Sequence, residues 1–170
     1  MSKYGVALEV GGGARSDGVT QVSLSLPVAW GEMDALGHVN NVVYFRYLEC
    51  ARVEFMRRCG MTELRTPQGV GVILQHVQCR FRRPIVFPDT VTITARVASI
   101  ESDRFTLDHE IISEAQTRDQ SKLATDRKPV VAAPVVAAVG TSTIVTYDYT
   151  NKAKVPIPAD LRRAIESMRL

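Results

Sequence analysis

Only one segment of this 170-residue chain has the pattern of a long amphipathic helix, and it covers residues 42–59. Its apolar side is formed by residues that recur every three or four positions, namely Val43, Tyr44, Tyr47, Leu48, Ala51, Phe55 and Cys59. Charged side chains, Glu54 among them, fall mostly on the other side. A helix with such a wide apolar side must pack it against another element, so this helix constrains the fold of the whole chain.

Both ends of the predicted helix carry residues that are typical of helix boundaries. Asn40 or Asn41 can cap the first turn, because an amide oxygen accepts hydrogen bonds from the N–H groups that a helix start leaves unpaired. Arg57 and Arg58 suit the negative end of the helix dipole, and Gly60 can adopt the left-handed conformation that ends many helices.

The remaining periodic segments favour β-strands, mostly through the alternation of apolar and polar residues that is typical of half-buried strands. They cover residues 21–28, 71–82, 91–100, 104–113 and 137–149. Short turns join several of them, which favours antiparallel pairing. The sequence therefore predicts an α+β fold in which one long helix packs on a five-stranded antiparallel sheet. One helix cannot cover both faces of such a sheet, so we also expect self-association.

Three segments lie outside this pattern. Residues 1–20 contain the stretch GGGARSDG and predict a mobile N-terminal arm. Residues 115–137 separate the last two strands by far more than a hairpin needs, and they predict a partly disordered insertion within a domain of residues 21–160. Residues 161–170 carry a short apolar stripe and predict a C-terminal helix.

The composition excludes several classes of function. A net charge of +3 is too small for a nucleic-acid-binding surface, although the arginine knot of Arg80, Arg82 and Arg83 suits a local anion such as a phosphate. No apolar run approaches the roughly 20 residues that span a bilayer, and the first residues do not resemble a signal peptide. The three cysteines lack the spacing of a zinc site. We expect a cytoplasmic protein without a metal, a nucleic-acid partner or a membrane span.

The stretch DALGHVNN, residues 34–41, gathers many hydrogen-bonding groups just before the helix. A capped loop explains part of this composition. However, Asp34 lies too far upstream to cap the helix directly, and His38 and two asparagines exceed what one cap needs. A helix start supplies unpaired N–H groups that stabilise an oxyanion, and a carboxylate beside them suits a base or a nucleophile for acyl transfer.

The residues from Trp30 to Phe55 resemble the hotdog-fold acyl-CoA thioesterases of the 4-hydroxybenzoyl-CoA thioesterase type. In that family a strand leads to an Asp, a Gly three residues later, and HVNN or a relative of it, before a Tyr-rich helix ending in E-x-A-R. This chain has these residue types at Asp34, Gly37, His38-Val39-Asn40-Asn41, Tyr44, Tyr47 and Glu49-Cys50-Ala51-Arg52. The later segments RFRRPIVFPDTVTI and VTYDYTNKAKVPIP are also similar to the family.

The resemblance implies a hotdog fold and hydrolysis of a CoA thioester to the free acid and CoA, with Asp34 as base or nucleophile. Asn41 falls where a backbone N–H polarises the thioester carbonyl in that family. His38 and Asn40 would line the reacting end of the substrate. No metal or redox cofactor is needed, because a thioester is already activated, and coenzyme A enters only as part of the substrate.

The residue types also indicate how a substrate would be bound. Tyr44 is expected in the core of the helix, where it would border the acyl pocket. Arg82 and Arg83 suit either the phosphates of coenzyme A or a solvated strand end. Because the family pairs subunits to complete its active sites, we expect a homodimer or a homotetramer. The size of the acyl group, the choice between dimer and tetramer, and the choice between base and nucleophile stay open.

Two other functions remain as alternatives: a hotdog hydratase or dehydratase, and an acyl-CoA-binding module without turnover. Release of thiol from a panel of acyl-CoA substrates separates these possibilities from a thioesterase. A second branch of the fold carries its catalytic acid inside the helix, after an HGG motif. This chain lacks that motif, which favours Asp34 over Glu49 or Glu54.

Other reactive residue types are expected to be structural. Cys50 and Cys59 lie on or near the apolar side of the helix, where packing explains them better than nucleophilic chemistry. His76 and His109 lie within predicted strands and suit satisfied structural positions. Trp30 is expected to anchor the loop before the helix.

Overall fold

A computed structural model of the chain describes residues 21–61, 69–114 and 133–169. The strands are β1 (Val22–Pro27), β2 (Val70–Phe81), β3 (Thr90–Ile100), β4 (Arg104–Ser113), β5 (Val135–Asp148) and β6 (Ala153–Lys154). The helices are the short 3-10 helix η1 (Trp30–Glu32), the long α1 (Asn41–Arg58) and α2 (Ala159–Ser167). The expected N-terminal arm and the polar half of the expected insertion lie outside the described residues.

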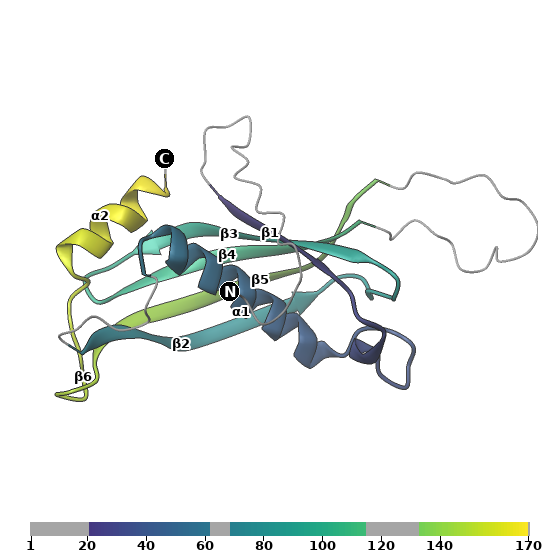
Figure 1. Ribbon diagram of the computed structural model, residues 1–170, viewed down its shortest axis with the longest axis horizontal. Helices are drawn as coiled ribbons and strands as arrows, with labels where there is room; N and C mark the ends of the chain where they lie inside the picture. Colours follow the sequence, from purple (N-terminus) through teal and green to yellow (C-terminus); the bar gives the residue numbers. More distant parts are fainter. Residues whose placement is uncertain (1–20, 62–68, 115–132, 170) are drawn as a thin grey trace, which may run out of the picture.

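All pairs of neighbouring strands are antiparallel, and the five long strands lie in the order β1-β3-β4-β5-β2. The two-residue strand β6 pairs with the end of β5. Helix α1 lies across one face of this sheet (Figure 1). The predicted α+β arrangement of one long helix on a five-stranded antiparallel sheet is therefore confirmed, with β6 as a short addition.

Strand β5 begins earlier than the sequence predicted. It starts at Val135, inside the segment 115–137 that was expected to be an insertion. Val135 pairs with Ser113, and Val136 pairs with Ile112, so the ladder with β4 continues through these residues. Two β-branched valines next to a long partner strand extend the ladder, and the Ala/Val/Pro composition alone did not indicate this.

The apolar side of α1 forms the centre of the core. Its buried residues include the predicted Tyr44, Tyr47, Leu48, Ala51 and Phe55, and the predicted Cys59 is buried directly after its last turn. Phe55 packs on Phe105 of β4, with ring centroids 6.1 Å apart. A Cβ atom at Gly140 of β5 would lie 2.7 Å from the carbonyl oxygen of Gln78 and 3.0 Å from Leu48 Cδ1. Glycine is therefore required there mainly because of the carbonyl oxygen of β2, and it also leaves room for the Leu48 side chain of the helix.

Helix α1 also begins and ends as the sequence predicted. Asn40 caps it, because its side-chain oxygen accepts a hydrogen bond from the N–H group of Val42 at 3.0 Å. Gly60 follows the last turn with a φ of 82°, which is the left-handed conformation that favours glycine.

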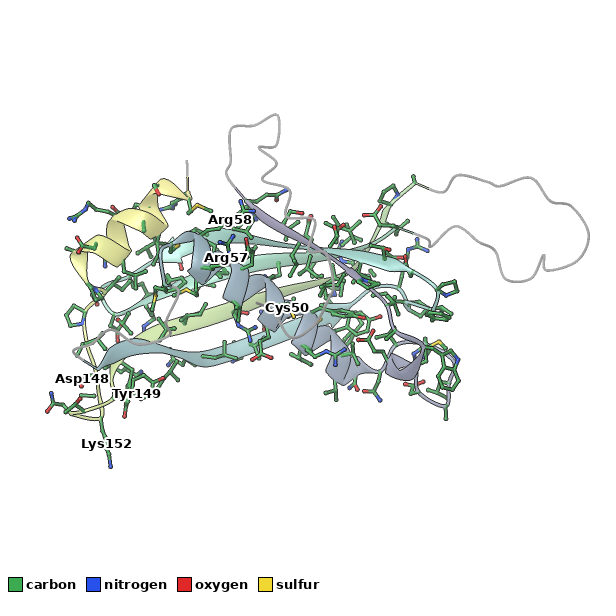
Figure 2. The ribbon with its side chains drawn as sticks, in the orientation of Figure 1. Cys50, Arg57, Arg58, Asp148, Tyr149 and Lys152 are labelled. Carbon is green, nitrogen blue, oxygen red and sulfur yellow. The ribbon has the colours of Figure 1, made fainter. Side chains whose placement is uncertain are left out.

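Glu54 departs from its expected place on the polar side of the helix, since it is only 8% exposed. Its carboxylate accepts hydrogen bonds from Arg57 at 2.8 and 2.9 Å and from Arg58 at 3.0 Å. These two arginines lie towards the C-terminal end of α1 (Figure 2). Their hydrogen bonds, led by those from Arg57, hold the pKa of Glu54 below its usual value. A carboxylate can be buried here because it is paired.

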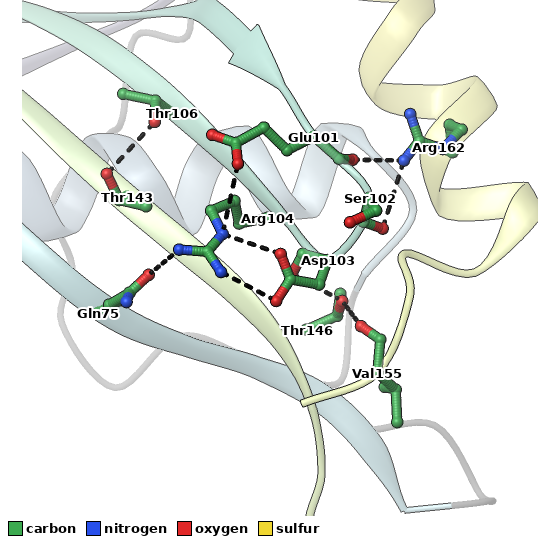
Figure 3. Close-up of polar contacts among 10 residues, drawn as sticks. All are labelled: Gln75, Glu101, Ser102, Asp103, Arg104, Thr106, Thr143, Thr146, Val155 and Arg162. Carbon is green, nitrogen blue, oxygen red and sulfur yellow. Dashed lines mark hydrogen bonds and ion pairs between the residues drawn. The ribbon is translucent and has the colours of Figure 1, made fainter. Parts of the chain in front are cut away.

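Helix α2 closes the end of the core that lies away from the start of α1 (Figure 1). Its Ile165 is fully buried. Arg162 donates hydrogen bonds to the backbone oxygens of Glu101 and Ser102 in the β3–β4 turn (Figure 3). In the same turn, the guanidinium of Arg104 binds the carboxylate of Asp103 at 2.8 and 3.1 Å.

The outer face of the sheet is polar. Strand β4 alternates between the two faces, so Leu107 is fully buried beneath α1 whereas its neighbours Thr106 and Asp108 are half-buried on the other side. Thr106 forms a hydrogen bond with Thr143 at 3.2 Å, and Asp108 accepts one from Arg96 at 2.9 Å.

Within the described ranges, no helix is long and apolar enough to cross a membrane.

One polar network is buried between α1 and the sheet, around His109, which is 2% exposed. His109 Nδ1 lies 3.0 Å from the carbonyl oxygen of Thr94, and Nε2 lies 3.0 Å from Ser142 Oγ. A carbonyl only accepts, so we infer that Nδ1 carries the proton and that Nε2 accepts from the Ser142 hydroxyl. Arg52 in turn donates to Ser142 Oγ at 3.2 Å. This satisfied network fits the structural interpretation of His109.

Burial lowers the pKa of His109 from 6.5 to about 4, although the hydrogen bond with Thr94 acts in the other direction. The folded protein therefore holds His109 neutral, while the unfolded chain protonates it near pH 6.5. Its contribution to stability is complete above pH 6.5 and is lost as the pH falls towards 4. We expect the wild-type protein to lose about 2 kcal/mol more unfolding free energy between pH 7 and pH 5 than a His109→Gln variant.

Urea denaturation at both pH values measures this difference. His76 lies exposed on β2, so His76→Gln is the matched control and should keep the wild-type pH dependence. Equal pH dependence in His109→Gln and wild type would contradict the assignment of a neutral buried imidazole.

Candidate active site

The loop between β1 and α1 contains a tight hairpin. Met33 and Val39 form an isolated β-bridge at its base. The N–H group of Asp34 donates to the carbonyl oxygen of His38 at 2.9 Å, and the N–H group of Gly37 donates to the carbonyl oxygen of Asp34 at 3.0 Å. Gly37 has a φ of 80°, so glycine suits this last position of the turn. The hairpin places Asp34 and His38 on facing arms.

The two carboxylate oxygens of Asp34 have different surroundings. Oδ1 accepts a hydrogen bond from the N–H group of Leu36 at 2.8 Å, which stabilises the turn. Oδ2 lies 3.9 Å from His38 Nδ1, which is too far for a direct hydrogen bond. The Asp34 side chain is 25% exposed. One oxygen thus holds the loop in shape, and the other stays accessible to a substrate or to water.

The first turn of α1 leaves one backbone donor available beside Asp34. The N–H group of Val42 bonds to the Asn40 side chain, and that of Val43 bonds to the Asn40 carbonyl oxygen at 2.9 Å. Among the described residues, the N–H group of Asn41 donates no hydrogen bond. This is the donor that a helix start offers to a developing oxyanion.

Tyr44 connects α1 to the segment that follows β2. Its hydroxyl accepts a hydrogen bond from the N–H group of Ile85 at 3.2 Å and lies 3.5 Å from the carbonyl oxygen of Arg83. Its ring meets the ring of Phe81 edge-on, with centroids 5.0 Å apart. Burial raises the pKa of Tyr44. The ring therefore forms a wall, while the hydroxyl is already occupied by the backbone.

These elements line an open pocket of about 450 Å³. Six of the seven site residues predicted from the sequence line it, namely Asp34, His38, Asn41, Tyr44, Arg82 and Arg83. The seventh, Asn40, uses its side chain to cap α1 instead. The pocket is completed by Val39 of the HVNN motif and by Phe81 and Pro84, for which the sequence indicated no role in the site. Their apolar character indicated burial in general and did not indicate which strand end reaches the start of the helix.

The three clustered arginines do not all lie at the same site: Arg82 and Arg83 line the pocket of Asp34, whereas Arg80 does not. The N–H groups of Arg82 and Arg83 both donate to the carbonyl oxygen of Ala137, at 2.8 and 3.0 Å. Their exposed guanidinium groups form no hydrogen bond or ion pair within the described part of the chain, so they are available to an anion. Arg80 lines a separate hollow of about 470 Å³, which it shares with Arg82, and does not line the pocket of Asp34.

The prediction that Trp30 anchors this loop is wrong, because its side chain is 71% exposed. Backbone hydrogen bonds hold η1 instead: the N–H group of Glu32 donates to the carbonyl oxygen of Ala29 at 3.0 Å, and that of Met33 donates to Trp30 at 3.3 Å. A local turn satisfies its own backbone groups, so it does not need the indole ring as an anchor.

Residues 28–165 match the family model described as the thioesterase-like superfamily. The chain belongs to this superfamily. A protein of Aquifex aeolicus (strain VF5), described as an esterase, is 31% identical over 85 residues, which are 49% of this chain and 66% of that protein. The long-chain acyl-CoA thioesterase FadM of Escherichia coli (strain K12) is 24% identical over 136 residues, which are 80% of this chain and 90% of FadM.

The fold also agrees with solved structures of this superfamily. A 4-hydroxybenzoyl-CoA thioesterase superimposes with a TM-score of 0.69 at 16% identity, over 85% of this chain and 98% of that one. The predicted hotdog fold and the predicted resemblance to thioesterases are thus confirmed. The protein is an enzyme that hydrolyses thioesters.

Proposed function

We propose that the pocket of Asp34 hydrolyses an acyl-CoA thioester to the free acid and coenzyme A. The observation that carries this proposal is that one pocket contains both an accessible Asp34 Oδ2 and the available N–H group of Asn41. The name of FadM and the 4-hydroxybenzoyl-CoA bound in the superimposed thioesterase support a CoA thioester as the substrate.

In the proposed reaction, the thioester carbonyl oxygen accepts a hydrogen bond from the N–H group of Asn41, which stabilises the negative charge of the tetrahedral intermediate. Asp34 Oδ2 either takes a proton from the attacking water or attacks the carbonyl carbon itself to form a mixed anhydride. Collapse of the intermediate breaks the C–S bond, and coenzyme A leaves as a thiolate that is then protonated. On the second route, water then hydrolyses the mixed anhydride, which releases the free acid and regenerates the Asp34 carboxylate. No metal or redox cofactor is required for these steps.

The other lining residues have proposed roles in binding. Val39, Tyr44 and Phe81 form an apolar wall for the acyl group. The free guanidinium groups of Arg82 and Arg83 bind the phosphates of coenzyme A.

At the reacting end, His38 lies against the thioester, since its ring is close to Asp34 Oδ2. Asn40 acts indirectly. It accepts hydrogen bonds from the N–H groups of Val42 and Val43, so the N–H group of Asn41 is the one left for the substrate.

We also propose a cytoplasmic location. Cys50, Cys59 and Cys79 are all free thiols, which suits a reducing compartment.

The charge of Asp34 should be essential for turnover. Asp34→Asn keeps the shape of the side chain but removes its charge and most of its basicity. We expect the kcat for acyl-CoA hydrolysis to fall by about 10²- to 10⁴-fold, with little change in Tm. Asp34→Glu should also be poor, because one extra methylene moves the carboxylate by about 1 Å. Thiol release from a panel of acyl-CoA substrates measures the effect.

Asp160 is 92% exposed on α2, far from the pocket, so Asp160→Asn serves as the matched control and should keep wild-type turnover. Single turnover in ¹⁸O-water tests the nucleophile role of Asp34, because an anhydride opened at the Asp34 carbonyl labels the protein, whereas direct attack by water labels only the product acid. Label in the protein therefore demonstrates the anhydride route. Near wild-type hydrolysis by Asp34→Asn would show that the central assignment is wrong.

Loss of Arg82 and Arg83 should weaken binding of the nucleotide part of the substrate. In the double variant Arg82→Ala/Arg83→Ala, we expect KM for an acyl-CoA to rise more than kcat falls. A short thioester that lacks the nucleotide should be affected less. Arg163→Ala, at a 70% exposed position on α2, controls for the loss of surface charge. Equal losses on both substrates would argue against phosphate binding by this pair.

We propose that the protein forms a homodimer or a homotetramer. Strand β2 pairs only with β5 and so leaves one long edge open within the described sheet. Large apolar side chains are exposed on β2 and α1, namely Leu74 at 41%, Phe81 at 47%, Val42 at 69% and Val53 at 53%. Edge-to-edge pairing of two sheets would cover such an edge and bring Asp34 near the partner chain.

Sedimentation at micromolar concentration and physiological salt tests this proposal, and we expect a species of at least two chains. A monomer under these conditions would count against it.

A further inference from the structure

Glu32 lies two residues before Asp34, and its side chain is only 11% exposed. Its carboxylate accepts hydrogen bonds from the Tyr47 hydroxyl at 2.6 Å and from the N–H group of Ala29 at 3.0 Å. It also forms an ion pair with the guanidinium of Arg46. Since Arg46 and Tyr47 belong to α1 and Ala29 precedes η1, this one carboxylate joins the loop to the helix at two points along its surface.

The backbone of Glu32 joins the same two elements a third time. Its carbonyl oxygen accepts a hydrogen bond from the N–H group of Asn40 at 2.9 Å, directly before the first residue of α1. The Met33–Val39 bridge follows immediately. Glu32 therefore stands at the base of the hairpin that carries Asp34, and it contacts the helix whose first free donor is the N–H group of Asn41.

One arm of the hairpin is anchored by packing, because Val39 is only 2% exposed and belongs to the core. The side that carries Asp34 has less packing, since Leu36 at the tip is 80% exposed and Trp30 in the preceding η1 is 71% exposed. Packing of Leu36 and Trp30 therefore does not fix the position of Asp34 relative to α1. The buried polar contacts of Glu32 can do so, because charge-assisted hydrogen bonds are short, directional and strong when partly shielded from water.

We propose that Glu32 is a positioning residue for thioester hydrolysis. By binding Tyr47 and Arg46, it holds the hairpin against α1 at a fixed distance between Asp34 Oδ2 and the N–H group of Asn41. Glu32 is not among the residues that line the pocket, and its oxygens are occupied by donors, so it acts through Asp34 and does not contact the substrate. This inference rests on the proposed function of Asp34.

The test is the kcat of a Glu32→Gln variant. The amide keeps the size of the side chain, but it loses the ion pair with Arg46 and turns one acceptor into a donor. A displacement of about 1 Å at the reacting groups costs up to about 100-fold in rate, so we expect kcat to fall by about 10- to 100-fold. KM for an acyl-CoA should stay within about twofold of wild type, because Arg82 and Arg83 are untouched.

Glu54 offers a matched control on the same helix. Its side chain is 10% exposed, and its carboxylate also binds two basic groups, those of Arg57 and Arg58. It lies near the other end of α1, away from the pocket. Glu54→Gln should lower Tm without lowering kcat when both variants are assayed well below their melting temperatures. A fall in kcat that is confined to Glu32→Gln supports positioning.

A second variant guards against poor folding of the first. Tyr47→Phe keeps the buried ring and removes one donor to Glu32, so we expect a smaller fall in kcat, again with little change in KM. When both substitutions are combined, the loss should be less than the product of the two single losses, because both act through one contact. Independent effects of the two substitutions would overturn the proposal.

Two other results would also overturn it. One is a kcat for Glu32→Gln equal to that of Glu54→Gln, and the other is a rise in KM with unchanged kcat. Failure of the proposed function has a different signature, which is retention of activity by Asp34→Asn in the same assay.

Discussion

The burial of α1 against the sheet is the interaction on which the rest of the structure depends. Leu48 and Phe55 are almost completely buried, and burying each such side chain contributes roughly 1.5–3 kcal/mol. The absence of a side chain at Gly140 leaves room on β5 for the Leu48 side chain and for the carbonyl oxygen of Gln78. This packing fixes the axis of α1, and with it the place where its first N–H groups emerge. The pocket lies at the start of α1, because the position of that helix end is fixed by the packing of the core.

The polar groups around α1 form contacts of three kinds, which have different consequences. Beneath the helix, the polar atoms of the His109 and Ser142 side chains all have hydrogen-bond partners. They help to fix the position of the helix without leaving a buried polar group unpaired. Along its surface, Glu32 joins the helix to the preceding loop. At its start, the N–H group of Asn41 finds no acceptor among the described residues. A single available donor in an otherwise satisfied environment is what an oxyanion site requires.

Several expectations failed for a common physical reason. Trp30 is exposed although aromatic residues are usually buried, and Glu54 is buried although carboxylates usually are not. Two arginines pair the carboxylate of Glu54, and backbone hydrogen bonds hold η1 without any contribution from the Trp30 ring. Hydrophobicity predicts how deeply a residue type is buried on average, whereas specific hydrogen bonds determine the burial of an individual residue. Strand β5 likewise begins earlier because a partner strand was present to pair with it.

The sequence by itself determined whatever depends on near neighbours in the chain. The period of α1, its Asn40 cap and the tight turn that begins at Asp34 all follow from local conformational preferences and short-range hydrogen bonds. Only the tertiary structure decided that Arg82 and Arg83 face that turn. Their position depends on the register of β2 with β5 and on the contact of Tyr44 with the backbone that follows β2. Such long-range contacts form only when the whole core packs, because loop closure has an entropic cost that no local pattern reveals.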